Sequence, residues 1–279
     1  MPELPEVETI ARSLREGNAG QPSILQYRIL RVELRWPRTL VIPQLAVLSP
    51  VLKSRIIAGI SRRGKFLVFD LDGITMLIHL RMSGDMLVRD WDSPIEKHNR
   101  LILWLRGEGG NCQLVFNDPR KFGRVWVTNQ PAYLLDTLGP EPLEESLTPA
   151  VFHGMLTGRQ RQLKPLLLDQ TFLAGLGNIY TDEALHLAKL HPLRNAGGLS
   201  KQESTRLLSA IRKVLSEGIR RNGASIDWVY RGGEYQNHFR VYGREGQPCL
   251  MCGTIITRQL VGQRGTHICE KCQKHPGAY

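Results

Sequence analysis

Four cysteines near the carboxyl end limit what this chain can fold into more than any other feature. They form two Cys-x-x-Cys pairs, Cys249/Cys252 and Cys269/Cys272, separated by 16 residues. Each pair can present two thiolates from a tight turn, and two such turns complete a tetrahedron around Zn²⁺. Because four protein ligands leave no position for water, the spacing predicts one structural zinc ion. Reduced cysteines without a metal are the alternative.

The charge of the chain favours a polyanionic partner. The 279 residues carry a formal net charge of +11 at pH 7, with a sequence pI of about 9.7. Proteins this basic commonly bind nucleic acid, although a cationic surface that serves only solubility is the alternative. No apolar stretch approaches the roughly 20 residues that cross a bilayer, and the acidic start lacks a secretion signal. We therefore expect a cytoplasmic protein with no membrane partner, and a monomer.

The order of apolar patterns predicts an α+β protein built from several parts. Pro5 suits the first turn of a helix, because its missing N–H would have no partner there in any case. From about residue 24 to residue 128, short β-branched and aromatic runs alternate with turn residues, as in a β-sandwich or barrel. After a Gly- and Pro-containing linker the pattern becomes helical, and Ser200 with Glu203 forms a capping box that opens a further helix.

The amino terminus offers an unusual nucleophile. Removal of Met1 would expose the secondary amine of Pro2, and an α-amino group has a pKa of roughly 7.7–8, so part of it is unprotonated at neutral pH. Such an amine can attack an aldehyde-level carbon and form an iminium, which accepts electrons during elimination. The carboxylate of Glu3 lies next to it and can move protons. Many cytosolic proteins begin Met-Pro, so this feature alone is weak.

A set of motifs, in one order along nearly the whole chain, resembles the formamidopyrimidine-DNA glycosylase and endonuclease VIII family of bacterial base-excision enzymes. Together with the four cysteines, the motifs are Pro2-Glu3-Leu4-Pro5-Glu6-Val7-Glu8-Thr9, Arg63-Gly64-Lys65, His79-Leu80-Arg81-Met82-Ser83-Gly84, Asn117-Asp118-Pro119-Arg120-Lys121-Phe122-Gly123, Leu138-Gly139-Pro140-Glu141-Pro142-Leu143, Asp169-Gln170, Ala174-Gly175-Leu176-Gly177-Asn178-Ile179-Tyr180 and Val241-Tyr242-Gly243-Arg244.

The resemblance implies a DNA-repair enzyme of base excision that is both a glycosylase and an abasic-site lyase. It implies that Pro2 forms a Schiff base with the sugar, that Glu3 transfers protons and that Glu6 supports the site. Elimination (β,δ) would then cut the strand on both sides of the sugar. Lys65 matches the family lysine that contacts phosphate and assists catalysis, whereas a solvent-facing lysine at a strand edge is its alternative. The partner would be double-stranded DNA with oxidised bases or abasic sites, bound in the bacterial nucleoid.

The resemblance also implies which side chains touch DNA. A damaged base must leave the duplex before it is cut out, so other groups must fill the hole. Met82, Arg120 and Phe122 match the three void-filling residues, since Met and Phe can wedge between bases and Arg can bond the orphaned base. Taken singly, Met82 or Phe122 would more often be a core residue. The positions that match phosphate-contacting residues of the family are His79, Lys164, Asn178, Tyr242 and Arg264.

With the family in view, we expect four segments. They are an N-terminal catalytic β-sandwich domain with flanking helices over residues 1–137, a linker over 138–147, a helix–two-turn–helix DNA-binding domain over 148–236 and a zinc-finger module with a β-hairpin over 237–279.

One segment departs from the family pattern. The stretch 224–236 is several residues shorter than the one that folds over 8-oxoguanine in typical members, and within it Trp228 or Tyr230 could stack on a base. Leu4 nevertheless favours the branch that removes oxidised purines, namely 8-oxoguanine and formamidopyrimidines. Two alternatives stay open: an enzyme that prefers oxidised pyrimidines, as endonuclease VIII does, and a zinc-finger protein that binds damaged DNA without catalysis.

Overall fold

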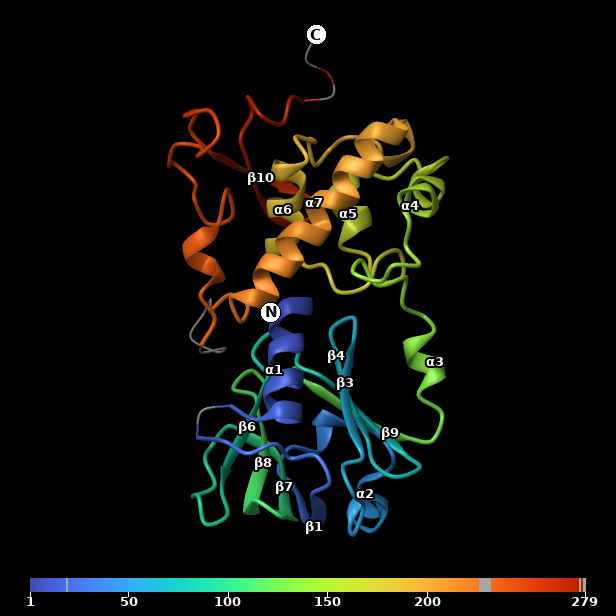
Figure 1. Cartoon of the computed structure of the whole chain (residues 1–279), viewed down its shortest axis with the longest axis vertical. Coiled ribbons are helices and arrows are strands. Elements are labelled where there is room, and N and C mark those ends of the chain that lie inside the picture. The colour runs from blue at the N-terminus through green and yellow to red at the C-terminus, as the bar shows by residue number, and fades with distance from the viewer. Residues whose placement is uncertain (19, 226–231, 276, 278–279) are drawn as a thin grey trace. The chain divides into compact units, whose positions relative to one another are not determined.

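The chain folds into two compact units (Figure 1). The computed structural model describes all residues except 19, 226–231, 276 and 278–279. Trp228 and Tyr230, and with them the middle of the shortened stretch, therefore lie outside the described residues. The first unit comprises Met1–Thr137 with Ser225–Gly232, and the second comprises Leu138–Ala224 with Gly233–Tyr279. Apart from residues 225–232, the predicted linker, helical and zinc-binding segments thus share the second unit.

The first unit is built from two β-sheets and one long helix. Its elements are α1 (Leu4–Glu16), β1 (Arg28–Leu34), η1 (Pro37–Thr39), β2 (Leu40–Ile42), α2 (Leu45–Leu52), β3 (Gly59–Arg63), β4 (Phe66–Asp70), β5 (Thr75–His79), β6 (Asp85–Asp90), β7 (Asn99–Gly107), β8 (Gly110–Asn117), β9 (Arg124–Thr128) and α3 (Ala132–Leu135). One sheet has the order β1-β7-β8-β6 and the other β2-β9-β5-β4-β3. Apart from the parallel pair β2–β9, neighbouring strands are antiparallel.

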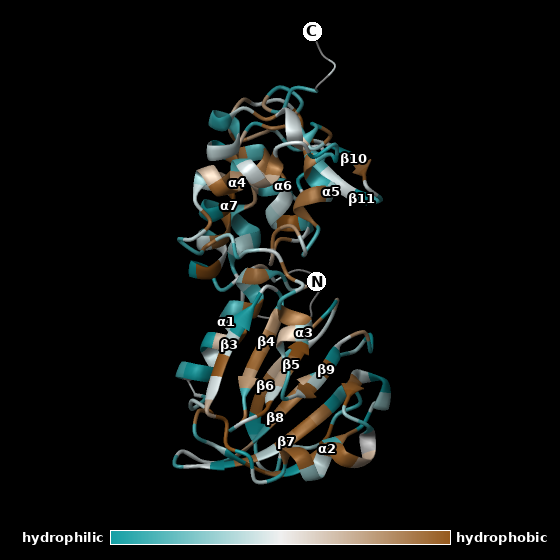
Figure 2. Cartoon of the chain, turned by 90° about the vertical axis from the view of Figure 1, so that its right-hand side faces the viewer, coloured by the Kyte–Doolittle hydropathy of each residue, from teal (hydrophilic) through white to brown (hydrophobic). Residues whose placement is uncertain are grey.

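Alternating side chains from both sheets fill one shared core. Figure 2 shows the apolar residues of the strands in brown. On β7, Leu101, Leu103 and Leu105 belong to this core, whereas Ile102 and Trp104 form a smaller cluster on the opposite face. This period of two is what a strand requires when one face is buried in a sandwich. The predicted β-sandwich is confirmed.

Helix α1 packs against β3 and β4 and starts next to the predicted Pro2 nucleophile. Val7, Ile10, Ala11 and Leu14 supply its buried stripe, as their helical spacing requires. Burial of this stripe fixes the helix on the sandwich, so the position of Pro2 relative to the first unit depends on packing and not on a free chain end.

Three turns that carry predicted site residues lie at one end of the sandwich. Phe66, at the start of β4, pairs with His79 at the end of β5, and His79 pairs with Arg124 at the start of β9. In the other sheet, Asp85 at the start of β6 pairs with Asn117 at the end of β8. The register therefore gathers the β3–β4 turn, the β5–β6 turn and the β8–β9 loop at the same end.

The second unit is mainly helical and includes a small hairpin. Its elements are α4 (Pro149–Leu156), α5 (Leu163–Leu167), α6 (Asn178–Leu187), η2 (Ala196–Gly198), α7 (Lys201–Arg220), η3 (Tyr235–His238), β10 (Thr257–Val261) and β11 (Arg264–Ile268). Helix α7 packs against α4 and α6, and α6 packs against β11. The predicted capping box at the start of α7 is confirmed, because Ser200 Oγ accepts from Glu203 N–H at 3.2 Å and Glu203 Oε2 accepts from Ser200 N–H at 2.9 Å. Within the described residues, no helix has the length and apolar content that crossing a membrane requires.

Two helical glycines of the second unit predict opposite responses to the same substitution. A Cβ at Gly154 would meet nothing within 4 Å, whereas a Cβ at Gly218 would lie 2.6 Å from the ring of buried Tyr180. We expect Gly154→Ala to stabilise the unit by about 0.5–1 kcal/mol, because alanine loses less backbone entropy in a helix. We expect Gly218→Ala to destabilise it by about 1–3 kcal/mol through overpacking. Urea unfolding of both variants measures this, and equal stabilities would contradict the described contact between α7 and Tyr180.

Candidate functional site

The amino terminus is held by buried carboxylates at the first turn of α1. Pro2 is buried, and Glu3 and Glu6 are each only 2% exposed. Glu3 is the N-cap residue, and its backbone N–H donates to Glu6 Oε2 at 2.7 Å. A buried carboxylate costs several kcal/mol unless it is hydrogen-bonded, and a helix N-terminus supplies both N–H donors and a favourable dipole. Two buried acidic groups therefore lie in the same short segment of chain as Pro2.

Lys65 lies on the same end of the sandwich and is buried. Lys65 lies in the turn between β3 and β4 and is only 5% exposed, so the alternative of a solvent-facing lysine is wrong. The end of β3 is joined to α1 by Arg62, whose Nε donates to Glu8 Oε2 at 2.9 Å. The helix that begins beside Pro2 and the turn that carries Lys65 are thereby held to each other.

His79 is a neutral interior side chain at the end of β5. Burial is the main cause that lowers its pKa to about 3, and the charges of Arg81 and Lys65 act in the same direction. Its Nδ1 accepts a hydrogen bond from Arg81 N–H at 3.0 Å, and its ring meets Phe66 edge to face at 4.9 Å. Any phosphate that His79 contacts would meet a neutral imidazole N–H and not a cation.

The three predicted void-filling residues lie on two loops at this end. Met82, in the β5–β6 turn, is half-buried, while Arg120 and Phe122, in the β8–β9 loop, are exposed. Phe122 is 48% exposed, and the Arg120 guanidinium carbon lies 5.1 Å from its ring centroid. A phenylalanine that belonged to the core would be buried. An exposed Phe stacked against an Arg suits insertion into a base stack. The three roles stay predictions, with a geometry that permits them.

The predicted DNA-contacting residues of the second unit gather around β11. Asn178 Nδ2 and Lys164 Nζ both donate to the carbonyl of Gly265, at 3.0 and 3.1 Å, and Gly265 follows Arg264. Tyr242 packs against His267 of the same strand with ring centroids 5.0 Å apart. Arg264 is exposed, as a phosphate contact requires.

Lys164 occupies a different environment from the one expected of a phosphate-binding lysine. Its side chain is fully buried, and its Nζ forms an ion pair with Asp182 Oδ1 at 2.6 Å. A direct contact with phosphate would require the ammonium to leave this pair, which is costly for a buried charge. In this structure, Lys164 therefore joins α5 to α6 and to the hairpin.

Two buried acids of α6 that the sequence analysis did not single out organise the zinc-binding part. Asp182 also accepts from the backbone N–H of His267 at 3.0 Å. Glu183 accepts from the consecutive N–H groups of Arg240, Val241 and Tyr242 at 2.9–3.0 Å. Adjacent helical residues thus bind the segment that precedes the first cysteine pair and the strand that leads into the second pair. Their one signal in the sequence was a pair of acids inside an apolar helix.

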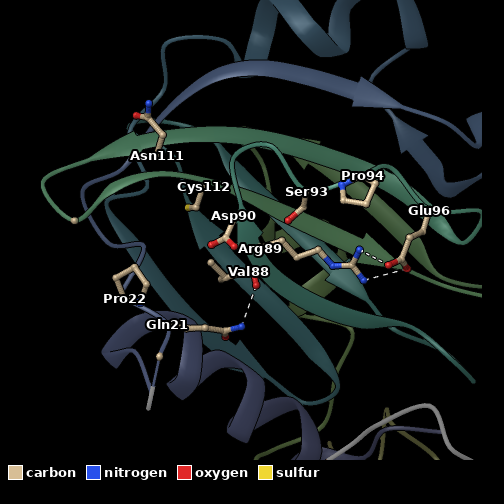
Figure 3. A pocket seen from close by; sticks show the side chains of 12 residues that line it. Gln21, Pro22, Val88, Arg89, Asp90, Ser93, Pro94, Glu96, Asn111 and Cys112 are labelled. Atoms are coloured by element: carbon tan, nitrogen blue, oxygen red, sulfur yellow. Dashed lines mark hydrogen bonds and ion pairs between the residues drawn. The ribbon is translucent and has the colours of Figure 1, made fainter.

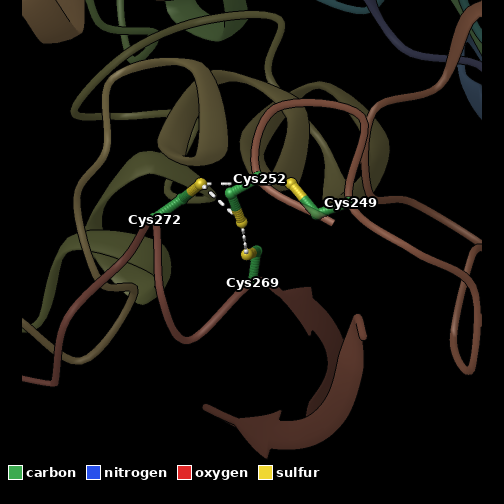
Figure 4. Close-up of side chains that lie close together, drawn as sticks. All are labelled: Cys249, Cys252, Cys269 and Cys272. Atoms are coloured by element: carbon green, nitrogen blue, oxygen red, sulfur yellow. Dashed lines mark hydrogen bonds between the residues drawn. The ribbon is translucent and has the colours of Figure 1, made fainter. Parts of the chain in front are cut away.

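The four cysteines cluster in the manner that zinc requires (Figure 4). Their Sγ atoms all lie within 4.8 Å of one another, and Cys252 approaches Cys269 at 3.4 Å and Cys272 at 3.5 Å. Tetrahedral Zn–S bonds of about 2.3 Å place sulfur atoms about 3.8 Å apart, so the residues fit the ion. His186 Nε2 lies 3.3 Å from Cys249 Sγ, where an N–H would stabilise a ligating thiolate. The site accounts for one structural zinc.

The first unit also has a hollow of about 550 Å³, separate from the predicted catalytic and DNA-contacting residues (Figure 3). It is lined in part by Gln21, Cys112 and the ion-paired side chains Arg89 and Glu96, which are 2.8 Å apart. Burial raises the pKa of the Cys112 thiol to about 11, so this fifth cysteine is an unreactive apolar residue. None of the predicted catalytic or DNA-contacting residues lines this hollow.

Comparison with protein families places three matches along the chain. The N-terminal domain of formamidopyrimidine-DNA glycosylase matches residues 1–125, and the H2TH domain of the same enzyme matches residues 138–229. A zinc finger found in FPG and IleRS matches residues 246–274.

Curated relatives and solved structures agree with these matches. A formamidopyrimidine-DNA glycosylase of Herpetosiphon aurantiacus is 42% identical over 98% of this chain and 100% of its own length, and one of Roseiflexus sp. is 44% identical with the same coverage. Wild-type Lactococcus lactis Fpg in complex with DNA containing N7-benzyl-Fapy-dG superposes with a TM-score of 0.90 at 37% identity, covering 98% of this chain and 100% of that one. The same Lactococcus enzyme bound to abasic-site DNA gives a TM-score of 0.88 with equal coverage.

Burial of neutral His79 predicts a pH dependence of stability. Its folded pKa of about 3 lies below the unfolded value near 6.5, so between these values the unfolded chain binds a proton that the folded chain does not. The contribution is complete above pH 6.5 and is lost as the pH falls toward 3, by up to about 1.4 kcal/mol per pH unit. We expect His79→Gln to flatten the pH profile of the unfolding free energy between pH 6.5 and 4. A His238→Gln variant, which removes an exposed histidine, is the control. Parallel profiles for His79→Gln and the parent would contradict a buried neutral imidazole.

The contact between His186 and Cys249 predicts weaker zinc binding when the imidazole is replaced. We expect His186→Phe to lower zinc affinity by about 10–100-fold, because a ligating thiolate loses its N–H partner. Competition with a chromogenic chelator measures the affinity. His153→Phe is the matched control, since His153 contacts Ser204 and not a cysteine. Equal affinities of the two variants would show that His186 does not support the metal site.

Proposed function

Because the chain belongs to the formamidopyrimidine-DNA glycosylase family, we propose that it excises oxidised purines from duplex DNA through a Schiff base at Pro2. As a member of this family it is a DNA glycosylase with abasic-site lyase activity that acts in base excision repair. The proposal adds the lesion class and the residues that carry the reaction. We also propose that the enzyme acts as a monomer on the DNA of the nucleoid.

The burial of Glu3 and Glu6 at the N-terminus of α1 is the observation that carries the proposed mechanism. With Met1 removed, the nitrogen of Pro2 attacks C1′ of the damaged nucleotide, and the bond from C1′ to the base breaks as the base leaves. Glu3 donates a proton to the sugar ring oxygen, the ring opens and the iminium forms. Loss of a proton from C2′ expels the 3′ phosphate, and a second elimination expels the 5′ phosphate.

Glu6 and Lys65 have supporting roles in this proposal. Glu6 fixes the backbone of Glu3 through the 2.7 Å hydrogen bond from the Glu3 N–H and so limits the positions that the Glu3 carboxyl can take. Lys65 contributes a buried cation on the same end of the sandwich. A phosphate next to the reacting sugar is the natural partner of such a cation, because the pair is strengthened where water is excluded.

Met82, Arg120 and Phe122 would occupy the space that the extruded nucleotide leaves. Met82 and Phe122 supply apolar surface for the neighbouring bases, and the Arg120 guanidinium can bond the orphaned base. On the second unit, Arg264 would contact a phosphate. His79, Lys164, Asn178 and Tyr242 would contact or orient the DNA backbone, Lys164 by positioning the strand that carries Arg264.

Oxidised purines are the lesion class that the comparisons support best. The Lactococcus structures that superpose on this chain hold DNA with formamidopyrimidine lesions of guanine or with abasic sites. Leu4 of the opening motif, fully buried in α1, also matches the purine branch. Because the stretch 224–236 is shortened, oxidised pyrimidines are the alternative lesion class that the experiment must test.

Borohydride trapping tests the mechanism and the lesion class together. The substrates are duplexes with 8-oxoguanine opposite cytosine or thymine glycol opposite adenine, and the proteins are the parent, Pro2→Gly and Glu3→Gln. We expect a covalent adduct mainly with 8-oxoguanine and a decrease of at least about 100-fold in both variants, since a nucleophile and a proton donor are removed.

Each other outcome revises a different part of the proposal. An adduct mainly with thymine glycol would move the enzyme to the oxidised-pyrimidine class and implicate the shortened stretch. An undiminished adduct in Pro2→Gly would assign the nucleophile elsewhere. No adduct on either duplex or on an abasic site, from zinc-loaded protein shown by mass spectrometry to lack Met1, would overturn the catalytic reading.

A further inference from the structure

The void-filling residues come from two loops that are distant in the chain. Met82 lies between β5 and β6, and Arg120 and Phe122 lie between β8 and β9. To occupy one hole in a base stack, side chains from both loops must keep a fixed spacing. A misplacement of about 1 Å in such a constellation can cost about 100-fold in rate. Some contact must therefore set the distance between the two loops.

The carboxylate of Asp118 connects these loops. Asp118 and Ser83 are both fully buried. The Ser83 hydroxyl donates a hydrogen bond to Asp118 Oδ1, and the Arg120 N–H points at both, 3.2 Å from Asp118 Oδ1 and 3.1 Å from Ser83 Oγ. The Gly123 N–H donates to Asp118 Oδ2 at 2.7 Å. Hydrogen bonds to a charged acceptor are about twice as strong as neutral ones.

The two loops also rest on the same aromatic ring. A Cβ at Gly84 would lie 2.8 Å from Phe116 Cε2, and a Cβ at Gly123 would lie 2.3 Å from Phe116 Cζ. Both loops therefore approach the fully buried Phe116 closely enough that only glycine fits. Packing on Phe116 fixes how closely both loops approach the core, while the contact between Ser83 and Asp118 fixes the distance between the loops.

Asp118 is itself anchored to the sandwich. Its N–H donates to the carbonyl of His98 at 2.9 Å, and its carbonyl accepts from Arg100 Nε at 2.7 Å. Arg100, only 6% exposed, also donates to the carbonyl of Lys97 at 3.1 Å. The carboxylate is thus fixed relative to the start of β7, so it can hold the β5–β6 turn in place and not merely move with it.

We propose that the hydrogen bond between Ser83 and Asp118 is a positioning link that sets the spacing of Met82 against Arg120 and Phe122 and thereby the rate of base extrusion. This inference rests on the proposed function, since it assigns these three side chains to the extruded-base gap. Ser83 and Asp118 are positioning residues that act through their neighbours. The link serves the step that opens the duplex and not the chemistry at Pro2.

The test separates extrusion from chemistry with two substrates. One is a duplex with 8-oxoguanine opposite cytosine, in which the base must leave the stack. The other is a single-stranded abasic oligonucleotide, on which Pro2 acts without extrusion. The proteins are the parent, Ser83→Ala, Asp118→Asn, the double variant and Ser93→Ala. Ser93→Ala makes the same chemical change in the same unit, at the hollow of Figure 3.

We expect Ser83→Ala to slow single-turnover excision from the duplex by about 10–100-fold while strand cleavage of the abasic oligonucleotide stays within about twofold. A 2-aminopurine beside the lesion should show a slower fluorescence rise, which reports extrusion directly. The double variant should be no slower than the slower single variant, because each change breaks the same link. Ser93→Ala should match the parent.

Three results would overturn the inference. These are unchanged excision in Ser83→Ala, equal losses on both substrates, or multiplicative losses in the double variant. Thermal melting identifies a general loss of folding in Asp118→Asn, in which case Ser83→Ala decides alone. A parent protein inactive on both substrates would mean that the proposed function fails, whereas an active parent with an indifferent Ser83→Ala would refute the link only.

Discussion

The burial of two carboxylates at the start of α1 is the constraint on which the rest of the first unit depends. Glu3 and Glu6 can be removed from water because the helix N-terminus supplies N–H groups and a favourable dipole, and because the stripe of α1 is packed on β3 and β4. The amino terminus thereby has a fixed position on the sandwich. The turn with Lys65 and the loops with Met82 and Phe122 reach the same end through the register of the strands.

Buried acids play the same organising part in both units. In the second unit, Asp182 and Glu183 hold, through backbone N–H groups, the segment before the first cysteine pair and the strand before the second pair. In the first, Asp118 holds two loops, one through the Ser83 hydroxyl and the other through the Gly123 N–H. An acceptor-only group that is fully buried must collect donors, and backbone donors from several segments fix those segments together. The exposed side chains that we propose contact DNA are therefore carried by a rigid interior.

Local patterns in the sequence predicted the features whose causes are local. The cysteine spacing gave the zinc site, Ser200 with Glu203 gave the start of α7, and alternating apolar runs gave the β-sandwich. The environments of Lys65 and Lys164 were not predictable, because a lysine looks the same in sequence whether it is exposed or buried. Asp182, the partner of Lys164, lies 18 positions away, and Ser83 lies 35 positions from Asp118. Hydrophobic periodicity does not indicate which residues are in contact when they lie this far apart in the sequence.

The central claim is that the chain reacts through the nitrogen of Pro2. Peptide mapping of the borohydride-reduced adduct with 8-oxoguanine DNA tests it most directly, because the sugar remnant stays on the nitrogen that formed the Schiff base. We expect a remnant on the α-nitrogen of an amino-terminal peptide that begins at Pro2. A remnant on Lys65 or on any other lysine would contradict it.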